Sequence, residues 1–408
     1  MVSQSLDNNE KVLGNQCIPN TYFLFESVKP FPNIQRCKRI SVMKARALAL
    51  ISLIVIIATI PGPTMMPIAE AQDVSDVNVL MIVTEAFGWN YFDAKSILES
   101  WGVNVTTIAY ALDTNVTGCF NRPHNWTIAD LLLSDVENDI VTQFDVLFIP
   151  SGGHWAGLIA STRVLDFISY AHEHGVIIAT TCIGNRVIAE SNGIVNGTSV
   201  VNYDNPNSYY SMVAAGARIR YGYEAVCDNG IITGNEGGGP TGGGYIEAPT
   251  SEICLSMVRE ALGYSYLQDA SVEPLSGEAG SSFEISVNVT DLDTELGSLS
   301  VVNLNISEVN ARIYTAENRT LIETVELVDP EGDWTYEGVY LGDIDGEYVI
   351  DIEIEDTNST LEIEREVLSI TVGDITTTTG LNFDPMVIGG IIAGGVGLLV
   401  IVIIIRRR

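Results

Sequence analysis

The feature that most constrains this chain is an apolar strand that turns sharply into a helix at a cysteine. Residues 176–181 (VIIATT) indicate a buried strand, Cys182-Ile183-Gly184 a tight turn, and the residues from Asn185 onward the start of a helix. Such a turn lifts a thiol above the edge of a sheet and beside a helix N-terminus, whose partial positive charge favours the thiolate. The pattern predicts a nucleophile elbow at Cys182, with a buried structural cysteine as the alternative.

The elbow lies within a longer alternation of strands and helices. The segments that show it, apolar strands and amphipathic helices in turn, are residues 77–84, 91–101, 103–110, 144–150 and 164–174. This order predicts an α/β fold with a parallel, flavodoxin-like sheet that helices cover on both faces. The predicted domain spans residues 76–267, and Asp228-Asn229-Gly230 marks a hairpin turn near its end.

A different composition begins near residue 270. Residues 270–375 hold 25 Asp and Glu against 3 Lys and Arg. Short runs of alternating apolar and polar residues, such as 283–289 and 348–354, are separated by turn signals. Period-two alternation with frequent turns predicts an all-β antiparallel sandwich over residues 270–373.

An N-terminal segment has the organisation of a secretory signal peptide. A basic start at Arg46, an apolar run over 47–58 and the small-residue exit at 69–71 (Ala-Glu-Ala) predict a signal peptide over residues 43–71. Residues 1–42 are then either a leader or the product of a mis-assigned start. An uncleaved N-terminal anchor is the alternative.

The C-terminal end predicts a membrane anchor. Residues 386–405 carry no charge and are long enough to cross a hydrocarbon core of ~30 Å. The arginines at 406–408 are expected on the cytoplasmic side, and a Thr-rich stalk at 374–385 precedes the span. The sequence therefore predicts a single-pass type I protein of the cell membrane, with an extracellular ectodomain.

Charge and glycosylation signals agree with an exported protein. The net charge of −32 argues against a nucleic-acid partner. Asn-x-Ser/Thr sites lie between the two apolar segments, so that the ectodomain is an expected glycoprotein. The candidate asparagines are Asn104, Asn115, Asn125, Asn196, Asn288, Asn305, Asn318 and Asn358.

The cysteine and histidine pattern predicts neither a metal nor a cofactor. The cysteines that follow the signal peptide are Cys119, Cys182, Cys227 and Cys254, and no Cys-x-x-Cys pair occurs among them. A zinc or thioredoxin-type site is therefore not expected. His172 and His174 lie on different faces of a predicted helix, which also argues against a shared metal.

Four segments of the α/β region together carry a family resemblance: 79–83 (VLMIV), 144–154 (FDVLFIPSGGH), 179–184 (ATTCIG) and 229–234 (NGIITG). In these segments the region resembles the DJ-1/PfpI family of the class-I glutamine-amidotransferase-like fold. The β-rich part resembles a generic immunoglobulin-like or fibronectin-type sandwich. The family resemblance implies cysteine-dependent peptidase, hydrolase or glyoxalase-type chemistry, and homodimerisation in many relatives.

Several positions depart from the family pattern. Ile183 stands where many hydrolase-like members have a His after the nucleophile, and Asn90 lies near the start of the first helix, where the family has a Glu. Asn205 precedes Pro206 in place of a His, and Gly184-Asn185 replaces Gly-Pro. A thiol without a base is a weak nucleophile at neutral pH.

Two residues are candidates to compensate for these losses. We assign Cys182 as the candidate nucleophile, Glu85 or His154 as its proton partner, and the amides of Gly153 and Ile183 as the candidate oxyanion hole. The alternative has His154 packed under Trp155 and Glu85 in solvent. The departures favour a retained scaffold that binds a small molecule or a surface protein, with a Cys182-dependent enzyme as the alternative.

Overall fold

The structure, a computed structural model, describes residues 73–119, 125–201, 206–235, 250–290 and 306–373. The predicted leader, signal peptide, stalk, transmembrane span and cytoplasmic tail lie outside these residues. None of the described helices is long and apolar enough to cross a membrane. The predicted domain limits stay predictions.

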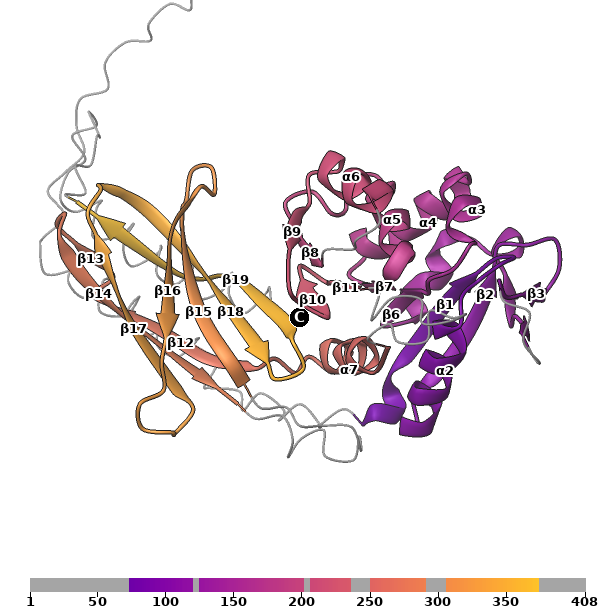
Figure 1. Ribbon diagram of the computed structural model, residues 1–408, viewed down its shortest axis with the longest axis horizontal. Helices are drawn as coiled ribbons and strands as arrows, with labels where there is room; N and C mark the ends of the chain where they lie inside the picture. Colours follow the sequence, from indigo (N-terminus) through magenta and orange to yellow (C-terminus); the bar gives the residue numbers. More distant parts are fainter. Residues whose placement is uncertain (1–72, 120–124, 202–205, 236–249, 291–305, 374–408) are drawn as a thin grey trace, which may run out of the picture. The chain divides into compact units, whose positions relative to one another are not determined.

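A largely parallel sheet forms the centre of the α/β region (Figure 1). Its strands, in spatial order, are β5 (Leu131–Leu132), β2 (Asn104–Ala109), β1 (Asn78–Val83), β6 (Val146–Ile149), β7 (Ile177–Thr181), β11 (Ile231–Gly234) and β10 (Ala225–Asp228). All neighbours pair in parallel except β10 and β11, which form the hairpin predicted at residues 228–230. The strands at the centre are buried on both faces, which explains why they are continuous apolar runs.

Helices cover both faces of this sheet. They are α2 (Asn90–Trp101), α3 (Trp155–Ile159), α4 (Thr162–Glu173), α5 (Asn185–Ala189), α6 (Pro206–Ala214) and α7 (Thr250–Ala261). Met81 packs in one core cluster with Leu98 of α2 and Met257 of α7, whereas its neighbour Leu80 packs in a second cluster with Phe167 of α4. Alternate side chains of one strand thus enter opposite cores, as the predicted α/β fold requires.

Short elements complete the region. They are the 3₁₀ turns η1 (Val74–Asp76), η2 (Leu133–Asp135), η3 (Asn138–Gln143) and η4 (Cys182–Gly184), the hairpin β3 (Asn115–Thr117) and β4 (Trp126–Ile128), and the parallel pair β8 (Ser199–Val201) and β9 (Arg218–Arg220).

The acidic C-terminal region consists of antiparallel strands in two sheets. The first sheet contains β12 (Leu267–Glu273), β14 (Ser281–Val289) and β17 (Thr335–Gly342). The second set contains β16 (Leu321–Leu327), β15 (Ile306–Thr315), β18 (Gly346–Asp356) and β19 (Thr360–Val372), and the short β13 (Ser276–Gly277) pairs in parallel with β19. Phe283 and Ile285 of β14 share a buried core with Ile313 of β15 and Ile352 of β18, so that the arrangement is sandwich-like.

One strand pairing joins the two regions into a single sheet. The start of β19 pairs in parallel with β10, with Ala225 opposite Thr360 and Asp228 opposite Ile363. The result is a 12-stranded sheet that runs from β16 to β5. The pairing satisfies the backbone groups at the β10 edge, which would otherwise be open to association with another chain. Nothing in the hydrophobic pattern of either strand predicts it.

Candidate functional site

The elbow at Cys182 has the predicted shape. β7 ends at Thr181, the 3₁₀ turn covers Cys182–Gly184, and α5 follows directly. Cys182 has a φ of +55°, a left-handed conformation that is uncommon for a residue with a side chain and that occurs at strained functional turns. The residue is almost completely buried, with 2% of its surface exposed.

Close backbone packing explains the glycine in this turn. A Cβ atom on Gly184 would lie 2.5 Å from Thr180 Oγ1 and 2.8 Å from the carbonyl oxygen of Ile149. Asn185, the first residue of α5, then donates from Nδ2 to the carbonyl of Gly234 at 3.1 Å. The turn is therefore held against both neighbouring strands, β6 and β11.

The Gly-Gly loop after β6 contacts the loop after β1. The N–H of Gly88 donates to the carbonyl of Ser151 at 2.7 Å, and the N–H of His154 donates to the carbonyl of Ala86 at 3.0 Å. A Cβ on Gly152, whose φ is +129°, would lie 2.2 Å from Gly88 N. Glycine is required here because the two backbones touch.

Asn90 stabilises this loop contact from the start of α2. Its Oδ1 accepts from the backbone N–H of Ser151 at 3.0 Å and from the Ser151 hydroxyl at 2.9 Å. Its Nδ2 is buried and has no hydrogen-bond partner among the described residues. The Asn90 side chain thus stabilises the Gly-Gly loop through hydrogen bonds to its carbonyl oxygen.

Glu85 is exposed at the end of β1. Its Oε2 accepts from the backbone N–H of Thr117 in β3 at 3.2 Å. This contact directs the carboxylate toward the β3–β4 hairpin.

His154 is buried, with 1% of its surface exposed. Its Nε2 lies 2.7 Å from the carbonyl oxygen of Pro150, which can only accept, so that Nε2 carries the proton. Nδ1 has no hydrogen-bond partner among the described residues. Burial lowers the pKa of His154 to about 4, and the bond to Pro150 only partly opposes this effect. The imidazole is therefore neutral at pH 7.

The sequence profile of the DJ-1/PfpI family matches residues 77–241. These residues form a DJ-1/PfpI domain. The match begins just before β1, includes the elbow and the Gly-Gly loop, and ends before α7.

Solved structures that are similar to part of this chain come from several organisms. A ThiJ/PfpI domain protein from Brachyspira murdochii is 19% identical over 46% of this chain and 98% of its own, with a TM-score of 0.39. Schizosaccharomyces pombe DJ-1 is 15% identical over 45% of this chain and 91% of its own, with a TM-score of 0.38. A two-domain protein from Anabaena variabilis, with DJ-1/ThiJ/PfpI-like and ferritin-like domains, is 20% identical over 46% of this chain and 48% of its own, with a TM-score of 0.38. Among curated proteins, none matches this chain significantly.

The DJ-1/PfpI domain carries a second thiol, Cys119, at the same loops. Cys119 follows β3, is partly buried, and donates from its backbone N–H to the carbonyl of Phe87 at 2.8 Å. Burial raises the pKa of the Cys119 thiol, and the nearby backbone N–H of Gly153, predicted for the oxyanion hole, partly opposes this rise. The amide of Ile183, the other predicted donor, lies within the 3₁₀ turn. The residues before Cys119, Asp-Thr-Asn-Val-Thr-Gly at 113–118, are mostly polar and form no motif that marks this thiol.

The other two cysteines that the structure describes, Cys227 and Cys254, are buried in the core. Burial raises the pKa of Cys227 to about 12 and also raises that of Cys254, whose sulfur lies 3.9 Å from the carbonyl oxygen of Ala94. No disulfide links the four cysteines of the described ranges. Within the same ranges, no three His, Cys, Asp or Glu side chains gather as metal ligands would.

The candidate glycosylation sites that the structure describes have accessible side chains. Exposed asparagines are Asn104, Asn115, Asn196, Asn288 and Asn318, and the partly buried ones are Asn125 and Asn358. Asn305 lies outside the described residues. Glycosylation stays a prediction.

Proposed function

We propose that this protein is a membrane-anchored, cell-surface protein whose DJ-1/PfpI domain binds a small molecule or a surface protein without thiol catalysis. The observation that carries the proposal is Asn90. The family resemblance implies a glutamate beside the thiol at this position. Here the side-chain amide of Asn90 instead accepts hydrogen bonds from both the N–H and the hydroxyl of Ser151. An amide cannot accept a proton at neutral pH, so that this position supplies no base.

The two compensating residues have other contacts. Glu85 accepts from Thr117 in the neighbouring hairpin, and His154 donates to Pro150 from a buried site. A His with a pKa of about 4 is a weak base at pH 7. These contacts support the scaffold interpretation over catalysis.

The predicted segments at both ends of the chain support the cell-surface part of the proposal. The signal peptide at 43–71, the span at 386–405 and the arginines at 406–408 would place residues 72–385 outside the cell. Protease treatment of intact cells should then release an ectodomain fragment by cutting near the stalk at 374–385. Resistance of the chain until the cells are lysed would contradict this topology.

Homodimerisation, which the family resemblance implies, is a further part of the proposal. Light scattering on the purified full-length protein in detergent should give twice the mass of one chain after correction for the detergent. A mass of one chain across a range of protein concentrations would contradict it.

A Cys182-dependent enzyme is the second candidate. It is favoured by the left-handed φ of Cys182, because strained turns of this kind occur at catalytic nucleophiles. The test compares full-length wild-type protein, Cys182→Ser and Cys119→Ser for turnover of α-oxoaldehydes and of peptide substrates. We expect the same baseline for all three, whereas turnover lost only in Cys182→Ser would establish the enzyme.

A further inference from the structure

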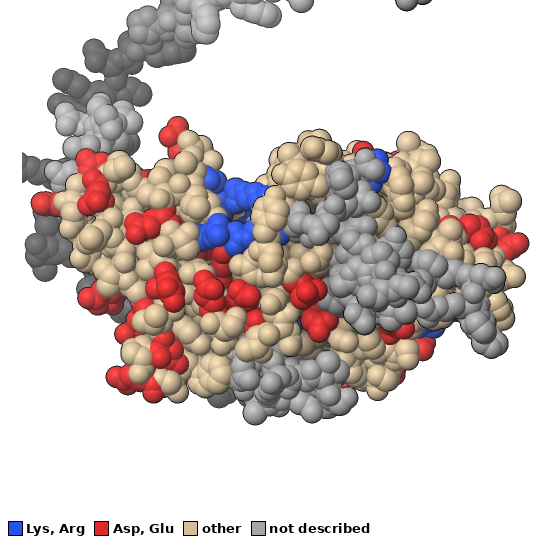
Figure 2. Space-filling view, viewed as in Figure 1, with Lys and Arg blue, Asp and Glu red and all other residues tan. Residues whose placement is uncertain are grey.

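Basic side chains gather where the C-terminal strands meet the DJ-1/PfpI domain. The described residues contain nine Lys and Arg, of which six lie at this junction. They are Arg218 and Arg220 of β9, Arg259 of α7, Arg312 of β15, Arg319 after β15, and Arg365 of β19. Figure 2 shows basic side chains (blue) together between β9 and the strands β15 and β18, with acidic side chains around them. This gathering needs an explanation in a chain with a net charge of −32.

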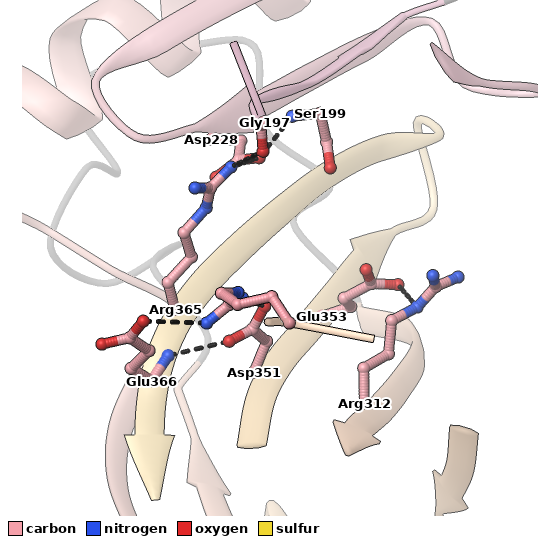
Figure 3. A network of polar contacts seen from close by, with 9 residues as sticks. Gly197, Ser199, Asp228, Arg312, Asp351, Glu353, Arg365 and Glu366 are labelled. Atoms are coloured by element: carbon pink, nitrogen blue, oxygen red, sulfur yellow. Dashed lines mark hydrogen bonds and ion pairs between the residues drawn. The ribbon is translucent and has the colours of Figure 1, made fainter. Parts of the chain in front are cut away.

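Most of these arginines balance buried carboxylates. Arg220 and Arg312 both contact the same oxygen of Glu353, with Arg312 Nε at 2.8 Å. Arg319 contacts Asp351 and also Glu366, the latter at 2.9 Å. Figure 3 shows both of these carboxylates, together with Glu353 and Arg312. Because Asp351 and Glu353 are almost fully buried, these cations are needed to stabilise the two carboxylates.

Arg218 differs from its neighbours in having no carboxylate partner among the described residues. Its guanidinium carbon lies 5.6 Å from the centre of the Tyr314 ring, and that of Arg319 lies 4.8 Å from the same centre. Tyr314 is itself 6% exposed and extends from the same face of β15 as Arg312. A partly buried guanidinium on an aromatic ring retains its planar N–H donors for an external acceptor.

Charge counting at this cluster, which we call the Arg218 cluster, leaves an excess of positive charge. Arg218, Arg220, Arg312 and Arg319 carry four charges, whereas Asp351, Glu353 and the half-exposed Glu366 supply three of opposite sign. Among the groups of this cluster in the described residues, Arg218 is thus the cation left without a partner of opposite charge. Glu308 and Glu355, which face each other further along β15 and β18, would repel a longer polyanion.

We infer that the Arg218 cluster binds a single oxyanion group, a carboxylate, sulfate or phosphate, of a ligand. Arg218 supplies the free planar donors, and Arg312 and Arg319, which are 24% and 21% exposed, add positive charge beside it. Guanidinium groups suit this ligand because their donors match the oxygens of planar and tetrahedral oxyanions. The site contains no residue of the elbow, so that it stands whether or not Cys182 reacts.

The test measures anion binding by the full-length protein in detergent. Thermal stability is followed as sodium acetate, sulfate or phosphate replaces sodium chloride at constant ionic strength. A ligand that binds the folded state raises its stability in a saturable manner. Sulfate and phosphate also stabilise proteins without a site, so that the comparison between variants decides the result.

Arg218→Gln and Lys95→Gln remove the same charge from different places. Lys95 is a good control because its partner Glu99 is one turn away on the surface of α2. We expect Lys95→Gln to bind as wild type does, and Arg218→Gln to bind roughly tenfold more weakly or not at all, since a hydrogen bond to a charged group is lost. If Arg218→Gln is unstable in chloride alone, Arg218→Lys replaces it and should bind with intermediate affinity.

The anion that gives the largest difference identifies the ligand group. A response to acetate alone points to a carboxylate, and a response to sulfate or phosphate points to the corresponding ester. The absence of saturable binding by wild type, or equal responses of Arg218→Gln and Lys95→Gln, would overturn the proposal. Neither result would bear on whether Cys182 is reactive, because the cluster contains no residue of the elbow.

Discussion

Arg365 of β19 forms an ion pair with the buried carboxylate of Asp228 in β10, through hydrogen bonds from two of its nitrogens. Nε lies 2.6 Å from Oδ1 and Nη2 lies 2.6 Å from Oδ2, while Nη2 also donates to the carbonyl of Gly197 at 2.7 Å (Figure 3). The same carboxylate accepts from the N–H of Ser199. This ion pair secures the strand pairing that joins the C-terminal strands to the DJ-1/PfpI domain.

Breaking this pair should strongly destabilise the protein. Arg365→Met keeps the aliphatic stem but leaves Asp228 charged and buried, which costs about 3 kcal/mol or more. Urea unfolding of the full-length protein measures the change, and adding Asp228→Asn should recover much of the loss. A decrease below about 1 kcal/mol in Arg365→Met would show that the pair contributes no more than a surface ion pair.

Asn90 should matter for stability rather than for chemistry. Asn90→Ala leaves two buried donors of Ser151 without their acceptor, for an expected loss of about 1–3 kcal/mol in the free energy of unfolding. Asn90→Asp retains an acceptor at the same place, so its free energy of unfolding should decrease less than that of Asn90→Ala. Asn115→Ala on the surface is the control, and a loss no larger than that of this control would refute the structural role.

Gly184 should not tolerate a side chain, because its Cβ would meet backbone as well as Thr180. We expect Gly184→Ala to lower the free energy of unfolding by about 1–3 kcal/mol. Gly157→Ala is the matched control, since a Cβ there would lie 3.5 Å from Thr84 Cγ2, an ordinary contact. Similar melting temperatures for the two variants would mean that the elbow is less tightly packed than described.

The neutral, buried state of His154 should make the protein sensitive to acid. Its pKa is depressed from 6.5 to about 4 by burial, so that the unfolded chain binds a proton that the folded protein excludes. Excluding this proton costs the folded protein no stability above about pH 6.5. The free energy of unfolding then decreases as the pH falls toward 4, by a total of about 3 kcal/mol. His154→Gln should flatten this part of the stability profile, whereas His174→Gln, on an exposed residue, should not. The same dependence of stability on pH in wild type, His154→Gln and His174→Gln would contradict a buried, neutral His154.

The sequence predicted the parts of the fold that depend on local pattern. The strand before Cys182, the turn at Gly184 and the hairpin at Asp228 are encoded by neighbouring residues, and the structure confirms them. Contacts between distant segments could not be predicted in this way. Asn90 and Ser151 meet only after two loops fold together, and the pairing of β19 with β10 leaves no signal in either strand.

The candidate site was predicted only in outline. The elbow follows from its own residues, but the roles of Glu85 and His154 depend on which groups fold around them. Glu85 meets Thr117 of a hairpin whose position no periodicity indicates, and His154 is buried against Pro150, four residues before it. Cys119 comes near Gly153 only through the folding of the β1 and β6 loops.

The most direct test of the proposed loss of catalysis is the pH dependence of Cys182 alkylation by iodoacetamide. The measurement uses full-length Cys119→Ser protein and quantifies the Cys182 peptide by mass spectrometry, which separates it from the buried Cys227 and Cys254. We predict slow alkylation at neutral pH, with a rate that rises only toward the titration of an ordinary thiol at about pH 8.5 or above. A rate that reaches its plateau below neutral pH, and loses that plateau in Glu85→Gln or His154→Gln, would show an activated nucleophile and contradict the account.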